Sequence, residues 1–225
     1  STFAQTQRLL AFGRDVSTKY TRRNRKEYEK IADYIGAVTE AQQGNYMVFF
    51  PSYRLMQDVY EVFAGKAVDS CEILMQHSNM KEHEREAFLE EFEKERQGTL
   101  VAFCVMGGIF GEGIDLKNDR LIGAIIVGTG LPQIGSEREI LKEYYDRKKQ
   151  SGFDYAYRYP GMNKVLQAAG RVIRTKEDRG VILLLDDRFL GRDYGEIFPR
   201  EWKDRSSCRL NTVEEAVSRF WRSFT

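Results

Sequence analysis

The stretch that decides the fold is Tyr46-Met-Val-Phe-Phe50, an unbroken run of apolar residues. A strand with one solvated face alternates apolar and polar residues, so an unbroken run indicates a strand that is buried on both faces. The run stops at Pro51, and Ser52 can cap a helix that follows it. The buried face of that helix is predicted to consist of Leu55, Val59, Val62 and Phe63.

The same step from an apolar strand to an amphipathic helix recurs along the chain. We predict further strands at residues 71–75, 100–105, 121–127 and 181–185. We predict further helices at residues 26–41, 79–92, 140–149, 162–174 and 213–224, with Asn79 and Glu82 as a capping pair. Strands that alternate with helices indicate an α/β fold: a mainly parallel central sheet with helices on both faces, in three layers.

Three regions do not follow this alternation. Residues 1–24 show little periodicity, so we interpret them as a lead-in segment ahead of a single domain at residues 25–225. Residues 151–160 are predicted as an aromatic loop, and residues 186–211 as irregular.

Composition limits the class of protein. The chain has 225 residues, of which 42% are hydrophobic and 31% charged, which is ordinary for a soluble globular domain. The formal net charge of +1 argues against a generally basic surface, so any contact with nucleic acid must be local. We find no signal peptide and no apolar run long enough to span a membrane, and we predict a cytoplasmic protein without a membrane partner. Because the chain begins at Ser1, we expect a fragment of a longer protein.

Metal binding is not expected. The three cysteines, Cys71, Cys104 and Cys208, are far apart in the sequence, and the chain has only two histidines. This set offers neither zinc-ligand nor iron–sulfur spacing, so we predict buried, reduced thiols and no metal site.

A glycine-rich stretch follows the strand predicted at residues 100–105. Four glycines occur in the seven residues from Gly107 to Gly113, which lets the backbone adopt positive φ or pass close to a ligand. Backbone N–H groups there can cradle phosphate, although the spacing is not G-x-G-x-x-G. Glu112 and Asp115 can hold a ribose hydroxyl, a cationic partner or a water. The alternative is a flexible loop with two solvated acids, and we favour the functional interpretation.

The residues Gln167-Ala-Ala-Gly-Arg-Val-Ile-Arg174 are the most informative candidate site. On a helix with about 100° per residue, Arg171 lies roughly 40° from Gln167 and Arg174 about 20° to the other side. Gly170 would then cost roughly 1 kcal/mol relative to alanine, which suggests that something approaches the backbone closely. Two guanidinium groups on one stripe suit a polyphosphate. The alternative is a solvated basic face.

Asp186 and Asp187 follow an apolar strand, as in a Walker B segment, where an acid holds magnesium. That interpretation needs the phosphate loop G-x-x-x-x-G-K-[ST], which the chain does not contain. The chain thus has the arginines of an NTPase without its phosphate loop. We infer half of a composite nucleotide site.

In a parallel sheet, ligands bind outside the carboxyl ends of the strands. We therefore expect sites in the turns after Phe50, Val105, Val127 and Leu185 and at the start of the helix that contains Gln167. The segment from Lys19 to Lys30 is also basic, with Tyr20 and Tyr28 between the charges. It is a possible edge for contacting a nucleic-acid strand, but we favour a solvated helix start there.

Taken together, these segments resemble the second motor domain of superfamily 2 helicases of the DinG/XPD-like family. The likeness runs from about Asp15 to the end of the chain. Residues 167–174 resemble the family's motif VI, residues 111–115 its motif V and residues 48–53 its motif IV. Residues 157–162, residues 178–189 and the ending at residues 220–221 also match that branch.

The resemblance implies a RecA-like fold and ATP-driven 5′→3′ movement on single-stranded DNA. It implies that Arg171 and Arg174 act as arginine fingers on the γ-phosphate, with Gln167 and Gly170 nearby. It implies that Ser52 and Tyr53 contact the DNA backbone. The residues that would bind nucleotide and couple it to DNA are Gly111, Glu112, Gly113 and Asp115.

The first motor domain, which would hold most of the ATP and Mg²⁺, has no counterpart in this sequence. Neither does the iron–sulfur cluster that some family members carry. We therefore expect a monomer whose fragment is inactive alone and whose partners are single-stranded DNA and the N-terminal motor domain. One alternative is a non-catalytic RecA-like module that binds nucleic acid or protein. A weaker one is a small-molecule enzyme that uses Asp115 and Glu112 as acid and base.

Overall fold

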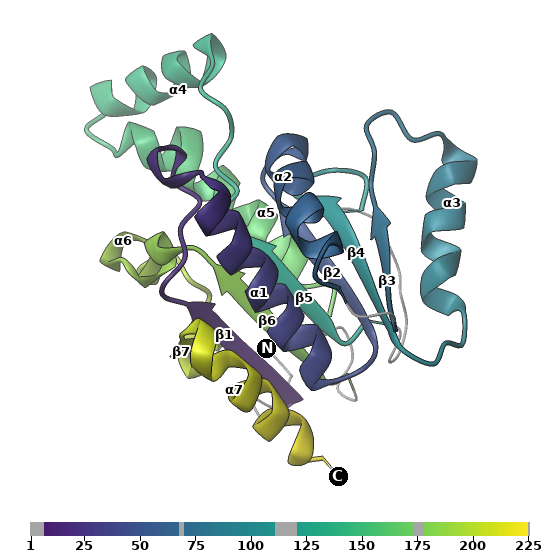
Figure 1. Cartoon of the computed structure of the whole chain (residues 1–225). Helices are drawn as coiled ribbons and strands as arrows, with labels where there is room; N and C mark the ends of the chain where they lie inside the picture. Colours follow the sequence, from purple (N-terminus) through teal and green to yellow (C-terminus); the bar gives the residue numbers. More distant parts are fainter. Residues whose placement is uncertain (1–6, 68–69, 111–120, 173–177, 225) are drawn as a thin grey trace.

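The computed structural model describes residues 7–67, 70–110, 121–172 and 178–224. Its centre is a sheet of seven parallel strands in the order β3-β4-β2-β5-β6-β1-β7 (Figure 1). The strands are β1 (Arg8–Gly13), β2 (Asn45–Phe50), β3 (Cys71–Met75), β4 (Thr99–Val105), β5 (Gly123–Val127), β6 (Gly180–Leu185) and β7 (Ser206–Cys208). The predicted α/β fold with a parallel sheet is confirmed.

The deciding stretch forms β2, and it lies near the middle of the sheet. All six residues of β2 are buried, because β4 and β5 flank it and helices cover both of its faces. Its register pairs Val48 with Phe103 of β4 and with Ile125 of β5. The other four predicted strands are confirmed within two residues at each end.

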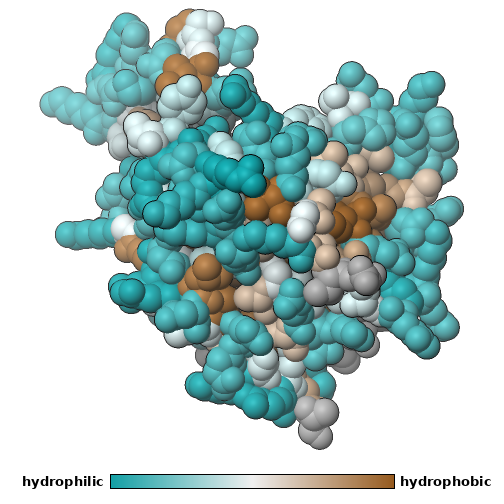
Figure 2. Space-filling view, in the orientation of Figure 1, coloured by the Kyte–Doolittle hydropathy of each residue, from teal (hydrophilic) through white to brown (hydrophobic). Residues whose placement is uncertain are grey.

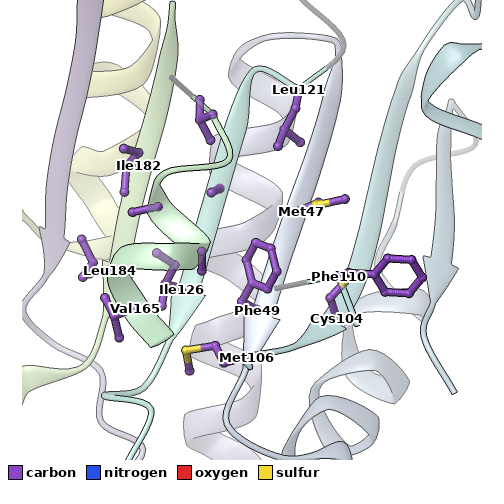
Figure 3. Close-up of a cluster of buried hydrophobic side chains, with 14 of the residues drawn as sticks. Met47, Phe49, Cys104, Met106, Phe110, Leu121, Ile126, Val165, Ile182 and Leu184 are labelled. Carbon is purple, nitrogen blue, oxygen red and sulfur yellow. The ribbon is translucent and has the colours of Figure 1, made fainter. Parts of the chain in front are cut away.

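Helices cover the sheet on both sides, which gives three layers (Figure 1). One hydrophobic cluster joins the sheet to α1 (Arg25–Ala41), α2 (Tyr53–Ala64) and α7 (Leu210–Arg222). The other joins it to α3 (Glu82–Glu90), η3 (Glu91–Glu93) and α5 (Tyr159–Ala169). Figure 3 shows this second cluster, in which Phe49, Ile126 and Val165 lie between the sheet and α5.

The lead-in interpretation of residues 1–24 is wrong for residues 8–13. They form β1, which pairs with β6 along its whole length and with β7 on its other side. Leu10, Ala11 and Phe12 are at most 2% exposed. A strand buried on both faces has no polar alternation, so its lack of periodicity indicated a core strand and not a loop.

The predicted aromatic loop at residues 151–160 is also wrong. Asp154–Arg158 form one turn of π-helix (η5) that runs directly into α5. Pro160, which has no N–H to donate, lies in the first turn of α5, directly after the π-helical turn. The preceding helix α4 (Ser136–Arg147) projects from the body of the domain (Figure 1).

Two smaller predictions need correction. Asn79 does not cap α3: it has a left-handed φ of 64°, and the Glu84 carboxylate instead accepts from the Lys81 N–H at 2.7 Å. The stretch predicted as irregular contains η6 (Asp187–Leu190), α6 (Arg192–Gly195), η7 (Arg200–Asp204) and β7. These elements are three to five residues long, too short to show a period in the sequence.

Candidate functional site

The parallel sheet has two chemically different ends. We call them the carboxyl edge, where Phe50, Val105, Val127 and Leu185 end their strands, and the amino edge, where the same strands begin. Each helix between two parallel strands returns the chain from the carboxyl edge to the amino edge. A residue at the start of such a helix and one at its end therefore belong to opposite edges.

Ser52 lies at the carboxyl edge and caps α2, as predicted. Its backbone is extended, with φ −158° and ψ 154°, and its Oγ accepts from the Leu55 N–H at 3.3 Å. This bond satisfies one of the N–H groups that the first turn of a helix leaves without a partner. The side chain is half-buried, so a phosphate oxygen can reach this helix start only from the solvent side.

Tyr53 follows directly, and its ring is 40% exposed. Its hydroxyl accepts a hydrogen bond from Gln76 Nε2 at 3.0 Å. Gln76 itself is only 2% exposed, and its Oε1 accepts from the Val105 N–H at 2.9 Å. The buried amide thus ties the tyrosine to the end of β4 and fixes its position. Sequence reasoning missed Gln76, although a polar residue directly after a predicted strand is a usable signal.

Gly107 opens the glycine-rich stretch and has a φ of 67°, so this turn uses the left-handed conformation that favours glycine. This supports the positive-φ interpretation at that position. Gly111, Glu112, Gly113 and Asp115 lie outside the described residues, so their assignment stays a prediction.

Asp186 is fully buried at the carboxyl edge. Its carboxylate accepts from Thr18 N–H at 2.9 Å, from Thr18 Oγ1 at 2.6 Å and from Arg188 Nε at 2.8 Å. Burial alone raises the pKa of Asp186, but the hydrogen bonds and charge of Arg188, together with the Thr18 hydroxyl, lower it on balance. This carboxylate is used inside the chain, which favours a structural role over the Walker B interpretation.

The residues Gln167, Gly170 and Arg171 lie at the amino edge, because they follow the middle of α5 and precede β6. We expected the site at the start of this helix, which lies at the carboxyl edge. That expectation is wrong for these three residues, because they lie at the end of the helix. Gln167 and Gly170 are exposed, and Arg171 is half-buried. Arg174 lies outside the described residues.

Gly170 is not in the middle of a helix. α5 ends at Ala169, and Gly170 is its C-cap with a φ of −68°, an ordinary helical value. The N–H of Arg171 bonds to Ala168 O at 3.2 Å, so the chain leaves the helix in a turn. A Cβ on Gly170 would meet Leu166 O at 3.3 Å and no other element. Among the residues that the structure describes, Gly170 makes room for no packed neighbour.

Two segments of the chain return to neighbouring positions at the amino edge. Leu121 and Ile122 lead from the glycine-rich stretch into β5, and Asp178 leads from the arginine segment into β6. These strands are adjacent, and the Val181 N–H bonds to Ile122 O at 2.9 Å. The chain therefore brings the described ends of both candidate nucleotide segments to the same edge.

The described part of the chain has neither a cluster of metal ligands nor a membrane span. There, no three His, Cys, Asp or Glu side chains gather in a way that could hold a metal ion. No described helix combines the length and apolarity needed to cross a bilayer. The cysteines carry free thiols: Cys104 and Cys208 are buried, and Cys71 is half-buried.

Known proteins resemble this chain in sequence. Residues 35–205 match the family described as helicase C-terminal domain. An ATP-dependent DNA helicase YoaA of Haemophilus influenzae is 32% identical over 187 residues, or 81% of this chain and 27% of that protein. An ATP-dependent DNA helicase XPD of Sulfolobus acidocaldarius is 29% identical over 182 residues, or 79% of this chain and 31% of that protein. The chain thus spans under a third of the length of these relatives.

Solved structures agree on the fold. A structure titled XPD_APO superposes with a TM-score of 0.71 over 90% of this chain and 40% of that one, at 21% identity. The C-terminal domain of the DEAD-box protein Dbp5 superposes with a TM-score of 0.53 over 96% of this chain and 98% of that one, at 13% identity. The chain belongs to the helicase C-terminal domain family, as a RecA-like domain of the DinG/XPD-like branch of superfamily 2.

Proposed function

We propose that this chain is the second motor domain of an ATP-dependent DNA helicase and that its two edges divide the work. In this proposal the amino edge faces a nucleotide and the carboxyl edge contacts single-stranded DNA, with movement in the 5′→3′ direction. The observation that carries it is the separation of the two sets of candidate residues. Ser52 and Tyr53 lie at the carboxyl edge, whereas Gln167 and Arg171 lie at the amino edge. The strands of one sheet and the helices between them connect the two edges.

At the amino edge, Arg171 and Arg174 would bind the γ-phosphate, with Gln167 and Gly170 beside it. The exposed amide of Gln167, one helical turn before Arg171, fits such a role because it is accessible from solvent. Gly111, Glu112, Gly113 and Asp115 would contact the nucleotide from the neighbouring segment. ATP and Mg²⁺ would be held mainly by an N-terminal motor domain, since this sequence has no phosphate loop.

The chemistry assigned to the arginines is electrostatic. As the γ-phosphoryl group transfers to water, negative charge spreads over its oxygens, and a guanidinium stabilises that charge. Arginine fingers of this kind contribute about 10³–10⁵ in rate. The first motor domain would supply the site in which they act, so this chain alone should bind ATP weakly and hydrolyse essentially none.

The test is Arg174→Ala in the full-length protein. We expect DNA-stimulated ATP turnover to fall by about 10³-fold or more, because the charge on the transferred phosphoryl loses its partner. Binding of single-stranded DNA, measured by fluorescence anisotropy, should stay within a factor of two or so of the parent. Arg147→Ala on the projecting helix α4 is the matched control, since its side chain is 80% exposed and its ion pair to Glu143 is solvent-exposed.

Three results would contradict the proposal. Unchanged turnover in Arg174→Ala would remove the finger assignment. Robust ATP hydrolysis by the 225-residue chain alone would show that the nucleotide site is not shared with another domain. A chain that binds DNA while the full-length protein shows no ATPase at all would favour a non-catalytic binding module.

A further inference from the structure

A pocket at the carboxyl edge is not used by the proposed function. It has a volume of about 310 Å³ and is lined by Tyr20, Arg23, Tyr28, Arg54, Leu55 and Asp58. The lining comes from three elements: the turn η2 (Tyr20–Arg22), the start of α1 and the start of α2. Both helices start at the carboxyl edge, and Arg54 of the lining follows Tyr53 directly in the chain.

Tyr20 stands out because its ring is 86% exposed although its backbone is held firmly. The segment before it is fixed to the core. Thr18 bonds to the buried Asp186 through both its N–H and its hydroxyl, and Ser17 donates its N–H to Glu27 Oε2 at 3.0 Å. Arg23 Nε donates to Thr18 O at 3.0 Å, which closes the turn from the other side. The turn therefore exposes an aromatic ring to solvent while hydrogen bonds hold its backbone in place.

The basic side chains near the pocket differ in whether they form ion pairs. Lys19 and Arg22 are neutralised, since both pair with Asp187 and Arg22 also pairs with Glu27. By contrast, Arg23 and Arg54 form no ion pair with any carboxylate in the described part of the chain. Both guanidinium groups are close enough to Tyr28 to lower the pKa of its hydroxyl, although burial and Asp58 raise that pKa more. Two arginines thus face one pocket together with the single carboxylate of Asp58, so positive charge exceeds negative charge in the lining.

Aromatic rings and arginines in one groove are the combination that binds single-stranded nucleic acid. A base stacks on an aromatic face whatever its sequence, and a guanidinium binds a phosphate. The alternative is a solvated helix start, but that would not require an ordered turn to keep a tyrosine in water. The volume, near the low end for ligand pockets, suits one nucleotide and not a folded segment.

We propose that Tyr20, Arg23, Tyr28 and Arg54 form a subsite for one nucleotide of a single-stranded nucleic acid. The base stacks on Tyr20, the phosphate binds Arg54 and Arg23, and Tyr28 forms the floor. This rests on the proposed function, because Arg54 is the chain neighbour of Tyr53 and the subsite extends the same strand path by one step. Figure 2 shows the face that carries this segment as predominantly hydrophilic, in keeping with a polar ligand.

The first experiment measures binding of a short labelled oligothymidylate to the 225-residue chain by fluorescence anisotropy. Tyr20→Ala should weaken binding roughly five- to a hundredfold, the effect of losing one stacked base. Tyr20→Phe should retain most of the affinity, because the ring remains. Tyr144→Ala, on an exposed tyrosine of α4, is the matched control and should leave binding unchanged. Because Tyr20 is so exposed, circular dichroism and Tm should not change in any of these variants.

The second experiment measures the salt dependence of the same binding. Arg54→Ala should weaken binding and reduce the slope of log K against log salt by about 0.7, the value for one phosphate contact on a single strand. Arg147→Ala should leave the slope unchanged. A series of oligonucleotides, each with one 5-iodouracil at a different position, can be crosslinked to the chain. We expect crosslinks to Tyr20 from one position and to Tyr53 from another.

The outcomes separate this subsite from the function it rests on. If Tyr53→Ala weakens binding but Tyr20→Ala and Arg54→Ala do not, the subsite is wrong and the strand-contacting edge stands. If the unmodified chain binds no oligonucleotide, both the subsite and the proposed DNA contact at the carboxyl edge are wrong. If Tyr144→Ala weakens binding as much as Tyr20→Ala, the effect is general and the subsite is overturned. If a polyglutamate peptide displaces the oligonucleotide from the parent but not from Arg54→Ala, the pocket is for an acidic protein segment instead.

Discussion

The two edges of the sheet differ in how their polar side chains are held. At the carboxyl edge, Gln76 fixes the hydroxyl of Tyr53, and Asp186 fixes the turn before Tyr20. At the amino edge, Gln167 is exposed, and its side chain makes no hydrogen bond to the residues that the structure describes. The carboxyl edge thus holds its polar side chains in place by contacts within the chain. At the amino edge, the exposed amide of Gln167 is a group that a second surface can engage, which is what the proposed sharing of a nucleotide site requires.

The largest expected effect on stability comes from the carboxyl edge. Asp186→Ala leaves Arg188 and the Thr18 hydroxyl without their buried acceptor, so the free energy of unfolding should fall by about 3–5 kcal/mol. Urea denaturation of the chain measures this. A change below about 1 kcal/mol would show that the Asp186 network does not build this edge.

The same carboxylate gives a pH dependence. The pKa of Asp186 is lowered in the folded chain, so its contribution is fully present above the ordinary aspartate pKa of about 3.9 and is lost as pH falls through the folded value. Asp186→Asn keeps the shape but removes this titration. Stability of the parent and of Asp186→Asn should therefore converge in strongly acidic solution. Parallel curves at all pH values would contradict the assignment.

Gln76 offers a way to loosen Tyr53 without touching it. In Gln76→Met the hydroxyl of Tyr53 loses its donor and the Val105 N–H loses its acceptor, so stability should fall by about 1–3 kcal/mol. If the comparison of the edges is right, binding of single-stranded DNA should weaken while ATP turnover at saturating DNA changes little. Tyr53→Phe, which removes only the hydroxyl, is the matched variant. A loss of turnover in Gln76→Met with normal DNA binding would contradict the division between the edges.

Ser52 carries two separable roles, a helix cap and a proposed contact with a phosphate. Ser52→Ala should cost about 1 kcal/mol of stability by removing the cap. Ser52→Asp keeps an acceptor for the Leu55 N–H but places a negative charge where a phosphate would bind. It should keep the parent's stability and bind the oligonucleotide more weakly than Ser52→Ala does. The reverse order of binding would show that Ser52 is a cap and nothing more.

The sequence predicted the sheet well, because short apolar runs bounded by turn residues are typical of buried strands and most helices have clear amphipathic spacing. It missed β1, since six residues without alternation were interpreted as a lead-in, although the same rule had identified β2. It missed the helical continuation at residues 151–160, where the aromatic residues and Pro160 suggested a loop. For the site, it identified Ser52 and Tyr53 but not Gln76, whose role depends on a neighbour 23 residues away.

Gly170 shows where a local argument from sequence needs the structure. The expected cost of a glycine inside a helix suggested a close approach to the backbone, but Gly170 ends α5 with a helical φ of −68°. Gly170→Ala should therefore change stability by less than about 1 kcal/mol, because alanine adopts this conformation and gains only one tight contact, to Leu166 O.

That near-neutral substitution is the most discriminating test of the amino edge. If ATP turnover of the full-length protein falls in Gly170→Ala while the stability of the chain does not, the absence of a Cβ at this position serves turnover and not folding, as a shared nucleotide site requires. Asn163→Ala, at an exposed position earlier on α5, is the control and should leave turnover unchanged. If turnover is unchanged in both variants, the glycine only ends the helix, and the case for the amino edge rests on the arginines alone.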